Sequence, residues 1–228
     1  MTKKYELVLD DTISFWGWKL FRIRALISFG SVEVGDLGGY IEKEENLSHD
    51  GNAWVYGNAK VSGNAKVWGD AKVSGNAKVW GDAKVSGNAK VWGDAKVSGN
   101  AKVSGNAWVY GNAEVWGNAK VSGNAKVWGN AWVYGNAEVW GNAKVSGNAK
   151  VWGNAEVSEL GDIIVFKNHW SSGRHFTYTK SNKMWKVGCF YGTGQELIKK
   201  AYRDSEKSGN YYKAYVDFVE TLERLSEE

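Results

Sequence analysis

Hydrophobic and polar residues alternate with a period of six over nearly half of the chain. From Gly51 to Ser158 the sequence divides into 18 consecutive hexads of the form G-[ND]-A-x-V-x, without an insertion. In an extended segment the alanine and the valine, two positions apart, point to one side, and the residues at positions four and six point to the other. We therefore predict that each hexad forms one short strand with alanine and valine in the interior.

The first two positions of the hexad predict a corner between strands. Glycine adopts positive φ values without steric cost, and asparagine or aspartate forms local side-chain hydrogen bonds. One hexad cannot bury its alanine and valine alone, so successive turns must stack into a solenoid. We expect the asparagines to pass amide hydrogen bonds from turn to turn along each corner, with interruptions at Asp70, Asp82 and Asp94.

The number of hexads in one turn decides the cross-section of the solenoid. Three hexads give a triangular coil and about six regular coils, whereas two hexads give a flat coil. The identical stretches that begin at Ala65, Ala77 and Ala89 favour two hexads per turn, but duplication of two hexads at a time produces this repeat in either geometry. A flat coil would reverse direction at each two-residue corner and would have a thin interior. We predict an all-β solenoid with about 18 residues per coil, and keep a flat solenoid with about 12 residues per coil as the alternative.

Aromatic residues occupy many of the outward positions. Ten of the 14 tryptophans lie in the hexads at places that should face solvent, which is more exposed ring surface than a soluble monomer normally carries. With three hexads per coil, rings stack on adjacent turns in two sets: Trp92, Tyr110 and Trp128, and Trp116, Tyr134 and Trp152. These rings either stabilise the coil by stacking or form contacts with another copy of the chain, with a protein partner or with a glycan.

Lysine is the most frequent residue at position four. The hexads contain 12 lysines against three aspartates and three glutamates, and the whole chain has a net charge of +4. Lysines interleaved with aromatic rings are typical of surfaces that bind single-stranded nucleic acids. They also keep sheet edges soluble and apart, which is the interpretation we favour, so we do not expect a nucleic-acid partner.

The flanking segments differ in composition from the hexads. Residues 1–50 predict a β cap, with strands at Tyr5–Leu9 and Leu20–Ile27 around a turn at 15–18, and an irregular first coil at Gly35–Glu42. Residues 159–228 predict a small α+β module after the solenoid of residues 51–158. This module should contain a hairpin around Ser171–Gly173, a third strand MWKVGCF from Met184, a helix with a capping box at Thr193 and Glu196, and a second helix after Gly209.

Two parts of the chain resemble a known family. A small residue two before an aliphatic one, repeated every six, is similar to the hexapeptide-repeat superfamily of single-stranded left-handed β-helices. The segment from Leu20 to Ala59, LFRIRALISFGSVEVGDLGGYIEKEENLSHDGNAWVYGNA, resembles the entry segment of YdcK-like bacterial and prophage proteins. The resemblance covers residues 1–158 and implies left-handed coils. Many members of the superfamily are trimeric acyltransferases, so it also implies relatives of that kind. It does not extend to the C-terminal module.

The resemblance also implies a catalytic residue that is missing here. In that superfamily a histidine that projects from the coils acts as the general base, but the 18 hexads contain no histidine. The three histidines are His49, His169 and His175. We therefore expect no acyl transfer and no cofactor, and the solitary cysteine excludes a multi-cysteine metal site.

Candidate chemistry outside the hexads lies in the C-terminal module. Cys189 with His169 or His175, and Asp162 as the orienting carboxylate, are residue types of a thiolate nucleophile and its base. A lone cysteine in an apolar strand is more commonly a small buried hydrophobe. Main-chain N–H groups at the turn of Gly192, Thr193 and Gly194 form a weak candidate site for an anion.

The sequence as a whole predicts a binding protein. The chain shows neither a secretory signal core nor a run of 18 apolar residues, so we expect a cytoplasmic protein without a membrane partner. We predict a non-enzymatic β-solenoid scaffold of phage or mobile-element type. Its aromatic faces and C-terminal module would be presented to a partner, with a homo-oligomer as the favoured assembly. The alternatives are an acyltransferase-like enzyme and a nucleic-acid-binding protein that uses the lysine and tryptophan faces.

Overall fold

The computed structural model describes residues 3–226 and divides the chain into two compact units, Met1–Leu160 and Gly161–Glu228. The first unit contains the hexads and the segment before them. The second contains an antiparallel sheet and two helices.

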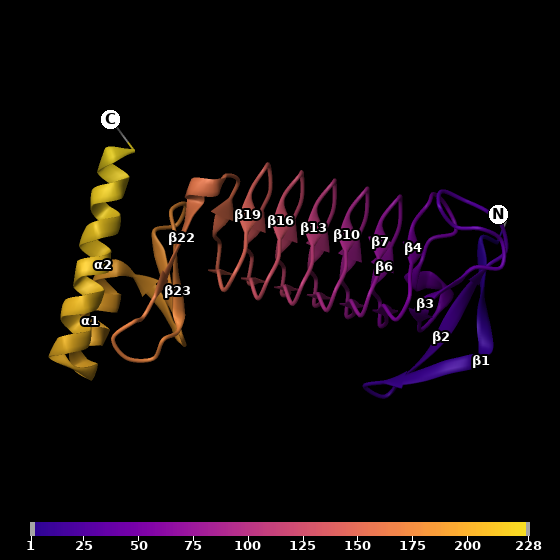
Figure 1. Cartoon of the computed structure of the whole chain (residues 1–228), viewed down its shortest axis with the longest axis horizontal. Helices are drawn as coiled ribbons and strands as arrows, with labels where there is room; N and C mark the ends of the chain where they lie inside the picture. Colours follow the sequence, from indigo (N-terminus) through magenta and orange to yellow (C-terminus); the bar gives the residue numbers. More distant parts are fainter. Residues whose placement is uncertain (1–2, 227–228) are drawn as a thin grey trace. The chain divides into compact units, whose positions relative to one another are not determined.

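The hexads form a parallel β-solenoid of triangular coils (Figure 1). Each hexad contributes one short strand, and strands pair in register with those three hexads away, as Lys96 does with Lys78 and Glu114. The strands therefore form three sheets, in the orders β4-β7-β10-β13-β16-β19, β5-β8-β11-β14-β17-β20 and β6-β9-β12-β15-β18-β21. The prediction of three hexads per coil is confirmed, and the flat alternative is wrong.

The strands of the hexads are β4 (Trp54–Val55), β5 (Lys60–Val61), β6 (Lys66–Val67), β7 (Lys72–Val73), β8 (Lys78–Val79), β9 (Lys84–Val85), β10 (Lys90–Val91), β11 (Lys96–Val97), β12 (Lys102–Val103), β13 (Trp108–Val109), β14 (Glu114–Val115), β15 (Lys120–Val121), β16 (Lys126–Val127), β17 (Trp132–Val133), β18 (Glu138–Val139), β19 (Lys144–Val145), β20 (Lys150–Val151) and β21 (Glu156–Val157).

The core of the solenoid consists of the alanines and valines of the hexads. Each of them is at most 1% exposed, which confirms the predicted inward direction. The corner glycines have φ values from +59° to +77°, a region that side chains with a Cβ rarely adopt. A Cβ on Gly105 would also lie 3.0 Å from the main-chain nitrogen of Gly123 in the next coil. Glycine is thus required both for the turn and for the close stacking of coils.

Asparagines form hydrogen-bonded ladders along the three corners. Asn88 Nδ2 donates to Asn106 Oδ1 at 3.0 Å, and Asn106 donates in turn to Asn124 at 3.1 Å. Asp70, Asp82 and Asp94 accept from the asparagine of the preceding coil, but a carboxylate cannot donate to the next coil. The predicted interruptions are therefore confirmed.

The N-terminal segment closes one end of the solenoid. It forms β1 (Tyr5–Phe15), β2 (Trp18–Ala25), β3 (Leu37–Ile41) and the 3₁₀ helix η1 (Glu44–Asn46). β1 extends further than predicted because it continues past a register shift between Val8 and Thr12. β3 pairs with β5 in parallel and places Tyr40 opposite Lys60, a longer separation than the three hexads of a regular coil. The coil between β3 and β5 is therefore longer than a regular coil.

The buried Lys4 links this cap to the first hexad. Its Nζ donates to the carbonyl oxygens of Ala53 at 2.9 Å and Gly51 at 3.3 Å, and lies 4.7 Å from the centre of the Phe29 ring. The residue is 1% exposed. Burial lowers the pKa of the Lys4 ammonium from 10.5 to about 8, although the nearby carboxylates of Asp50 and Asp70 oppose this shift.

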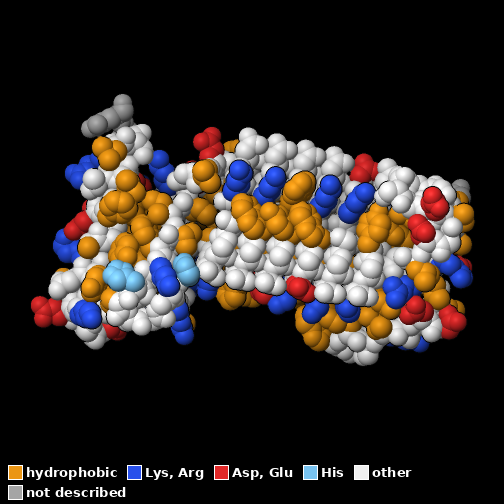
Figure 2. Space-filling view, viewed as in Figure 1, with side chains coloured by type: hydrophobic (Ala, Val, Ile, Leu, Met, Phe, Trp, Pro, Cys, Tyr) orange, Lys and Arg blue, Asp and Glu red, His pale blue; other side chains and the backbone are white. Residues whose placement is uncertain are grey.

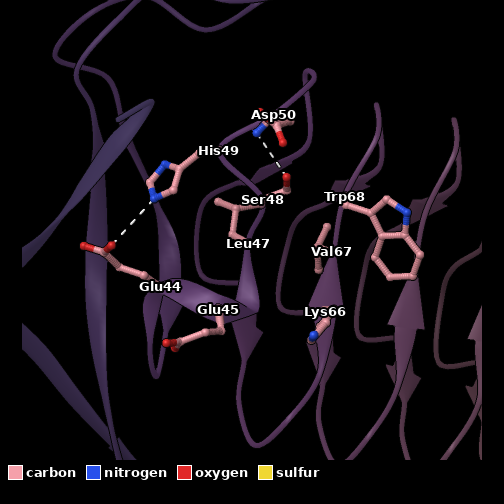
Figure 3. Close-up of a pocket in the computed structure, with 9 residues that line it drawn as sticks. All are labelled: Glu44, Glu45, Leu47, Ser48, His49, Asp50, Lys66, Val67 and Trp68. Carbon is pink, nitrogen blue, oxygen red and sulfur yellow. Dashed lines mark hydrogen bonds and ion pairs between the residues drawn. The ribbon is translucent and has the colours of Figure 1, made fainter. Parts of the chain in front are cut away.

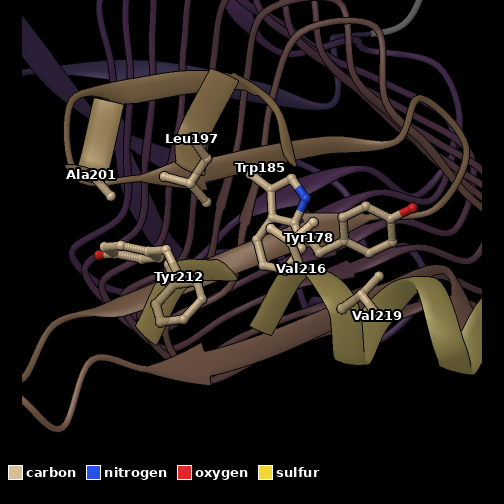
Figure 4. Packing of buried hydrophobic residues seen from close by; sticks show 8 residues of the cluster. Tyr178, Trp185, Leu197, Ala201, Tyr212, Val216 and Val219 are labelled. Carbon is tan, nitrogen blue, oxygen red and sulfur yellow. The ribbon is translucent and has the colours of Figure 1, made fainter. Parts of the chain in front are cut away.

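The second unit contains an antiparallel sheet of four strands and two helices. The 3₁₀ helix η2 (Leu160–Asp162) precedes β22 (Ile163–Lys167), β23 (His175–Thr179), β24 (Met184–Val187), β25 (Phe190–Thr193), α1 (Gly194–Asp204) and α2 (Glu206–Leu225). The predicted hairpin and the capping box of α1 are confirmed. The buried residues Phe176, Tyr178 and Trp185 of the sheet pack with Leu197 and Ala201 of α1 and with Tyr212, Val216 and Val219 of α2 (Figure 4).

Two boundaries predicted for this unit are wrong. MWKVGCF is not one strand, because the chain turns at Gly188, whose φ is +55°, and Cys189 lies exposed in this turn. The second helix begins at Glu206 rather than after Gly209, because the Ser205 side chain accepts from the Ser208 N–H and caps it. Gly209 lies inside the helix, where a Cβ would approach the Tyr202 ring to 2.2 Å.

The corner ladders predict that the three aspartates limit stability. Replacing Asp70, Asp82 and Asp94 together by asparagine adds a donor to each corner, and we expect a rise in the free energy of unfolding of about 0.5–1 kcal/mol per substitution. Thermal unfolding measures this change. Asn106→Asp, which removes one donor from an intact ladder, is the control and should lower the unfolding temperature; an increase there, or no change in both variants, would contradict the ladder.

The buried Lys4 predicts a pH dependence of stability. Its pKa of about 8 in the folded chain lies below the ordinary 10.5, so between these values the unfolded chain binds more protons. This contribution makes the unfolding free energy rise with pH from 8 to 10.5 and stay constant below pH 8. We expect the rise in wild type but not in Lys4→Met, measured by urea unfolding across this range. Parallel curves for the two proteins would show that burial does not lower the pKa of Lys4.

Candidate functional site

The outward positions give the three faces of the solenoid different chemistry. We name the sheet that begins with β4 the aromatic–lysine face, because its outward side chains are rings and lysines except at Ser74 and Ser146. The sheet that contains β5 is the hairpin face, on which the tip of the β1–β2 hairpin packs. The sheet that contains β6 is the serine–lysine face. Figure 2 shows the first of these as an orange patch beside a row of blue lysines, over the strands labelled β7 to β19 in Figure 1.

Three rings stack along the aromatic–lysine face. The ring centroids of Trp92 and Tyr110 lie 4.3 Å apart with an angle of 2° between the planes, and those of Tyr110 and Trp128 lie 5.8 Å apart at 5°. The predicted stack on adjacent turns is confirmed. Because the rings face one another along the solenoid axis, Tyr110 has both faces covered, and only the outer faces of Trp92 and Trp128 are available to a further ring.

Lysines on this face contact rings rather than carboxylates. Trp108 packs edge-on against Trp92 with ring centroids 5.4 Å apart, and lies between the ammonium groups of Lys90 at 5.2 Å and Lys126 at 4.4 Å. Within residues 3–226, Lys72, Lys90 and Lys126 have no carboxylate at salt-bridge distance. The face therefore presents uncompensated positive charge next to aromatic surface.

A cavity of about 540 Å³ interrupts the ring row near the N-terminal end of this face. Its wall residues include Tyr56 and Trp92, and Ser74 of the coil between them lines it as well. Lys72 and Lys90 also line it, and the Lys72 ammonium lies 3.4 Å from Ser31 Oγ and 5.9 Å from the Tyr56 ring centre. The sequence indicates this gap, because Tyr56, Ser74 and Trp92 follow one another at intervals of three hexads. These residues are recognised as neighbours only when the coil is known to contain three hexads.

The hairpin face uses its rings differently. Trp116, Tyr134 and Trp152 do meet on adjacent coils, with centroids 5.1 Å and 3.7 Å apart, but their planes are tilted by 57° and 58°. Tyr134 is only 8% exposed as a result. The hairpin tip covers another part of this face, where Trp16 packs edge-on against Trp80 at 5.0 Å. Rings on this face thus stabilise the solenoid by packing on each other and on the cap.

Fewer hexad tryptophans are exposed than the sequence suggested. Trp54 is 1% exposed because Tyr5 and Phe29 of the cap pack against it. On the serine–lysine face Trp68 and Trp140 are the exposed ones, at 38% and 45%. Most of the others are half-buried by their neighbours.

A second cavity, of about 490 Å³, lies beside η1 at the capped end of the solenoid (Figure 3). His49 lines it and is stacked on Tyr5 with centroids 4.4 Å apart. Its Nδ1 accepts the Lys4 main-chain N–H at 3.2 Å, and its Nε2 lies 3.6 Å from Glu44 Oε2. The Lys3 ammonium, through its hydrogen bond, holds the pKa of the Glu44 carboxyl below its usual value. These contacts tie the cap together and give His49 a structural role.

The candidate nucleophile and histidines of the second unit do not form a catalytic group. Cys189 is exposed in the β24–β25 turn. His169 Nδ1 lies 3.3 Å from the Tyr215 hydroxyl, and His175 begins β23 opposite Lys167. Among residues 161–226 no hydrogen bond joins Cys189 to either histidine, and no three His, Cys, Asp or Glu side chains of the described chain are placed to hold a metal ion.

The weak anion site at the start of α1 is occupied by the chain itself. The Glu196 carboxylate accepts from the Thr193 main-chain N–H at 2.8 Å and from its hydroxyl at 3.0 Å. Those hydrogen bonds hold the pKa of the Glu196 carboxyl below its usual value. Gly192 is paired with Trp185 in the sheet. A further cavity, in the second unit, is lined by Gly194 together with Glu220 and Glu223. The local carboxylates make this position unfavourable for an anion.

The geometry defines the class of protein as a parallel β-solenoid, and the repeat identifies its type. The family model described as the YdcK β-solenoid repeat matches residues 95–111, which span β11, β12 and β13 and thus about one coil. The resemblance to YdcK-like solenoids is therefore confirmed for the repeat, and residues 95–111 of this chain are similar to the YdcK β-solenoid repeat. None of the curated proteins matches the chain. No helix within residues 3–226 is long and apolar enough to cross a membrane.

Proposed function

We propose that the chain is a non-enzymatic β-solenoid scaffold that binds a partner through the aromatic–lysine face. The observation that carries this proposal is the parallel stack of Trp92, Tyr110 and Trp128 beside lysines that lack carboxylate partners. Interfaces are enriched in tryptophan and tyrosine because large rigid rings lose little conformational entropy on binding. A regular solenoid holds such rings in fixed positions, so a binding surface there is preorganised.

The other faces support this choice by contrast. On the hairpin face, the cap packs on Trp80, the tilted rings farther along pack on one another, and Lys96 pairs with Glu114 at 2.7 Å. On the serine–lysine face, Ser86, Ser104 and Ser122 follow one another on adjacent coils, and Lys120 pairs with Glu138. Only the aromatic–lysine face combines a parallel ring stack with unpaired lysines in the described part of the solenoid.

The alternatives lack comparable support. An acyltransferase-like activity has no histidine in the 18 hexads to use as a base, and Cys189 is not joined to a histidine. Nucleic-acid binding along the whole face would need rings with open faces, whereas the Tyr110 ring is covered on both sides. A phage or mobile-element role, and the homo-oligomer, stay predictions; self-association through the same face is one form of the proposed binding.

The proposal predicts that removing the stack removes binding without unfolding the solenoid. The combined variant Trp92→Ser, Tyr110→Ser and Trp128→Ser copies the three consecutive serines of the serine–lysine face, so the coil should remain intact. If the wild-type chain is an oligomer, we expect the variant to have a lower mass in solution, measured by light scattering. If the wild-type chain captures a protein that binds again after purification, we expect the variant not to capture it. Circular dichroism verifies the fold.

The matched control removes exposed rings from another face. Trp68→Ser with Trp140→Ser should retain the mass and the captured partner of wild type. Equal mass and equal capture in wild type, control and triple variant would contradict the proposed function.

A further inference from the structure

The aromatic row has one missing member. At position six of consecutive coils the aromatic–lysine face carries Tyr56, Ser74, Trp92, Tyr110 and Trp128. The small serine leaves the outer face of Trp92 uncovered on the side of Tyr56. The cavity of about 540 Å³ occupies this place, and its size lies within the range of about 300–1,000 Å³ typical of small-molecule sites.

The gap has the thickness of one planar ring. Tyr56 and Trp92 are two coils apart, which corresponds to about 9.5 Å at a strand spacing of about 4.8 Å. A guest ring at the level of Ser74 would lie one coil from each wall. This is the same relation as that of Trp92 and Tyr110, whose centroids are 4.3 Å apart and whose planes are parallel within 2°. A planar ring would therefore continue the stack that the chain itself begins.

The charge around the gap selects an anionic substituent. Lys72 and Lys90 belong to adjacent coils and both line the cavity. The residues that line it include no carboxylate. The two nearest aspartates in sequence, Asp70 and Asp94, accept hydrogen bonds from Asn52 and Asn76 at the corners. The two lysines are register partners on neighbouring strands, so two positive charges border the gap and favour an anionic group such as a phosphate.

We propose that this gap, walled by Tyr56 and Trp92 above Ser74, binds a nucleotide, with the base between the rings and the phosphate at Lys72 and Lys90. The inference rests on the proposed function of the same face and specifies its ligand. Stacking of a base on an aromatic side chain is tolerant of sequence because each base has a π face. The site therefore recognises a base with its phosphate, supplied either by a free nucleotide or by a single strand.

The test uses the full chain and adenosine 5′-monophosphate as the probe, with calorimetry to measure affinity. We expect one nucleotide per chain, and at least tenfold weaker binding of adenosine and of inorganic phosphate, because each lacks one of the two contacts. Ser74→Trp places the chain's own ring in the gap and should abolish binding. Ser146→Trp, which adds a ring next to Trp128 at the other end of the stack, is the matched control and should bind as wild type does.

A second pair of variants keeps the proposal testable if Ser74→Trp does not fold. Lys72→Gln with Lys90→Gln should weaken the nucleotide at least tenfold and change adenosine binding less than twofold. Oligoadenylate that binds more tightly than the mononucleotide, and is blocked by Ser74→Trp, identifies a strand as the source; equal or weaker binding identifies the free nucleotide. No nucleotide binding at millimolar concentration, or binding that Ser74→Trp leaves unchanged, overturns the inference.

The nucleotide-binding test and the test of the proposed function can give different results. The Ser74→Trp chain retains Trp92, Tyr110 and Trp128, so the association assays still report on the stack when nucleotide binding fails. Conversely, nucleotide binding that Ser74→Trp blocks, together with unchanged mass and capture in the triple serine variant, would show a nucleotide site on this face and contradict only the binding of a protein partner.

Discussion

The rest of the structure depends on the stacking of each coil directly on the next at one strand spacing. Alanine and valine fill the interior at every hexad and are essentially inaccessible to solvent. The corner glycines approach those of the next coil so closely that a Cβ at Gly105 would contact Gly123. Because a small interior and small corners are needed at every step, positions four and six of the hexad vary most widely, and these two positions carry most of the surface chemistry.

The mismatch between the duplicated unit and the coil distributes that chemistry over three faces. The stretches that begin at Ala65, Ala77 and Ala89 are identical over two hexads, but a coil contains three. Their tryptophans, Trp68, Trp80 and Trp92, consequently lie on three different faces. Rings meet only where another block falls in register, as Tyr110 does with Trp92 and Trp128. The parallel stack and the gap before it thus result from a few aligned hexads within an otherwise uniform repeat.

The sequence was sufficient for the solenoid and insufficient for several local features. Strict periodicity identified the inward residues, because they follow from strand geometry alone. It left 12 and 18 residues per coil open, and the choice of 18 came from the sharp corners and thin interior of a flat coil. The ring stacks follow once that coil length is adopted. The pattern of MWKVGCF does not predict the turn at Cys189, because apolar residues continue on both sides of Gly188. The burial of Trp54 and the position of Gly209 depend on Tyr5, Phe29 and Tyr202, and these are contacts across the chain that periodicity does not describe. The gap at Ser74 becomes visible only when residues three hexads apart are known to be neighbours.

The register of three hexads per coil is tested most directly by cross-linking across neighbouring coils. In a Cys189→Ser chain, cysteines replacing Ser104 and Ser122 lie at equivalent places beside β12 and β15, about 4.8 Å apart at their Cα atoms, a separation that a disulfide spans. We expect rapid formation of this disulfide on mild oxidation, and none between cysteines replacing Ser86 and Ser98, which are two hexads apart and belong to different sheets. Efficient cross-linking of the second pair but not of the first would contradict the triangular coil.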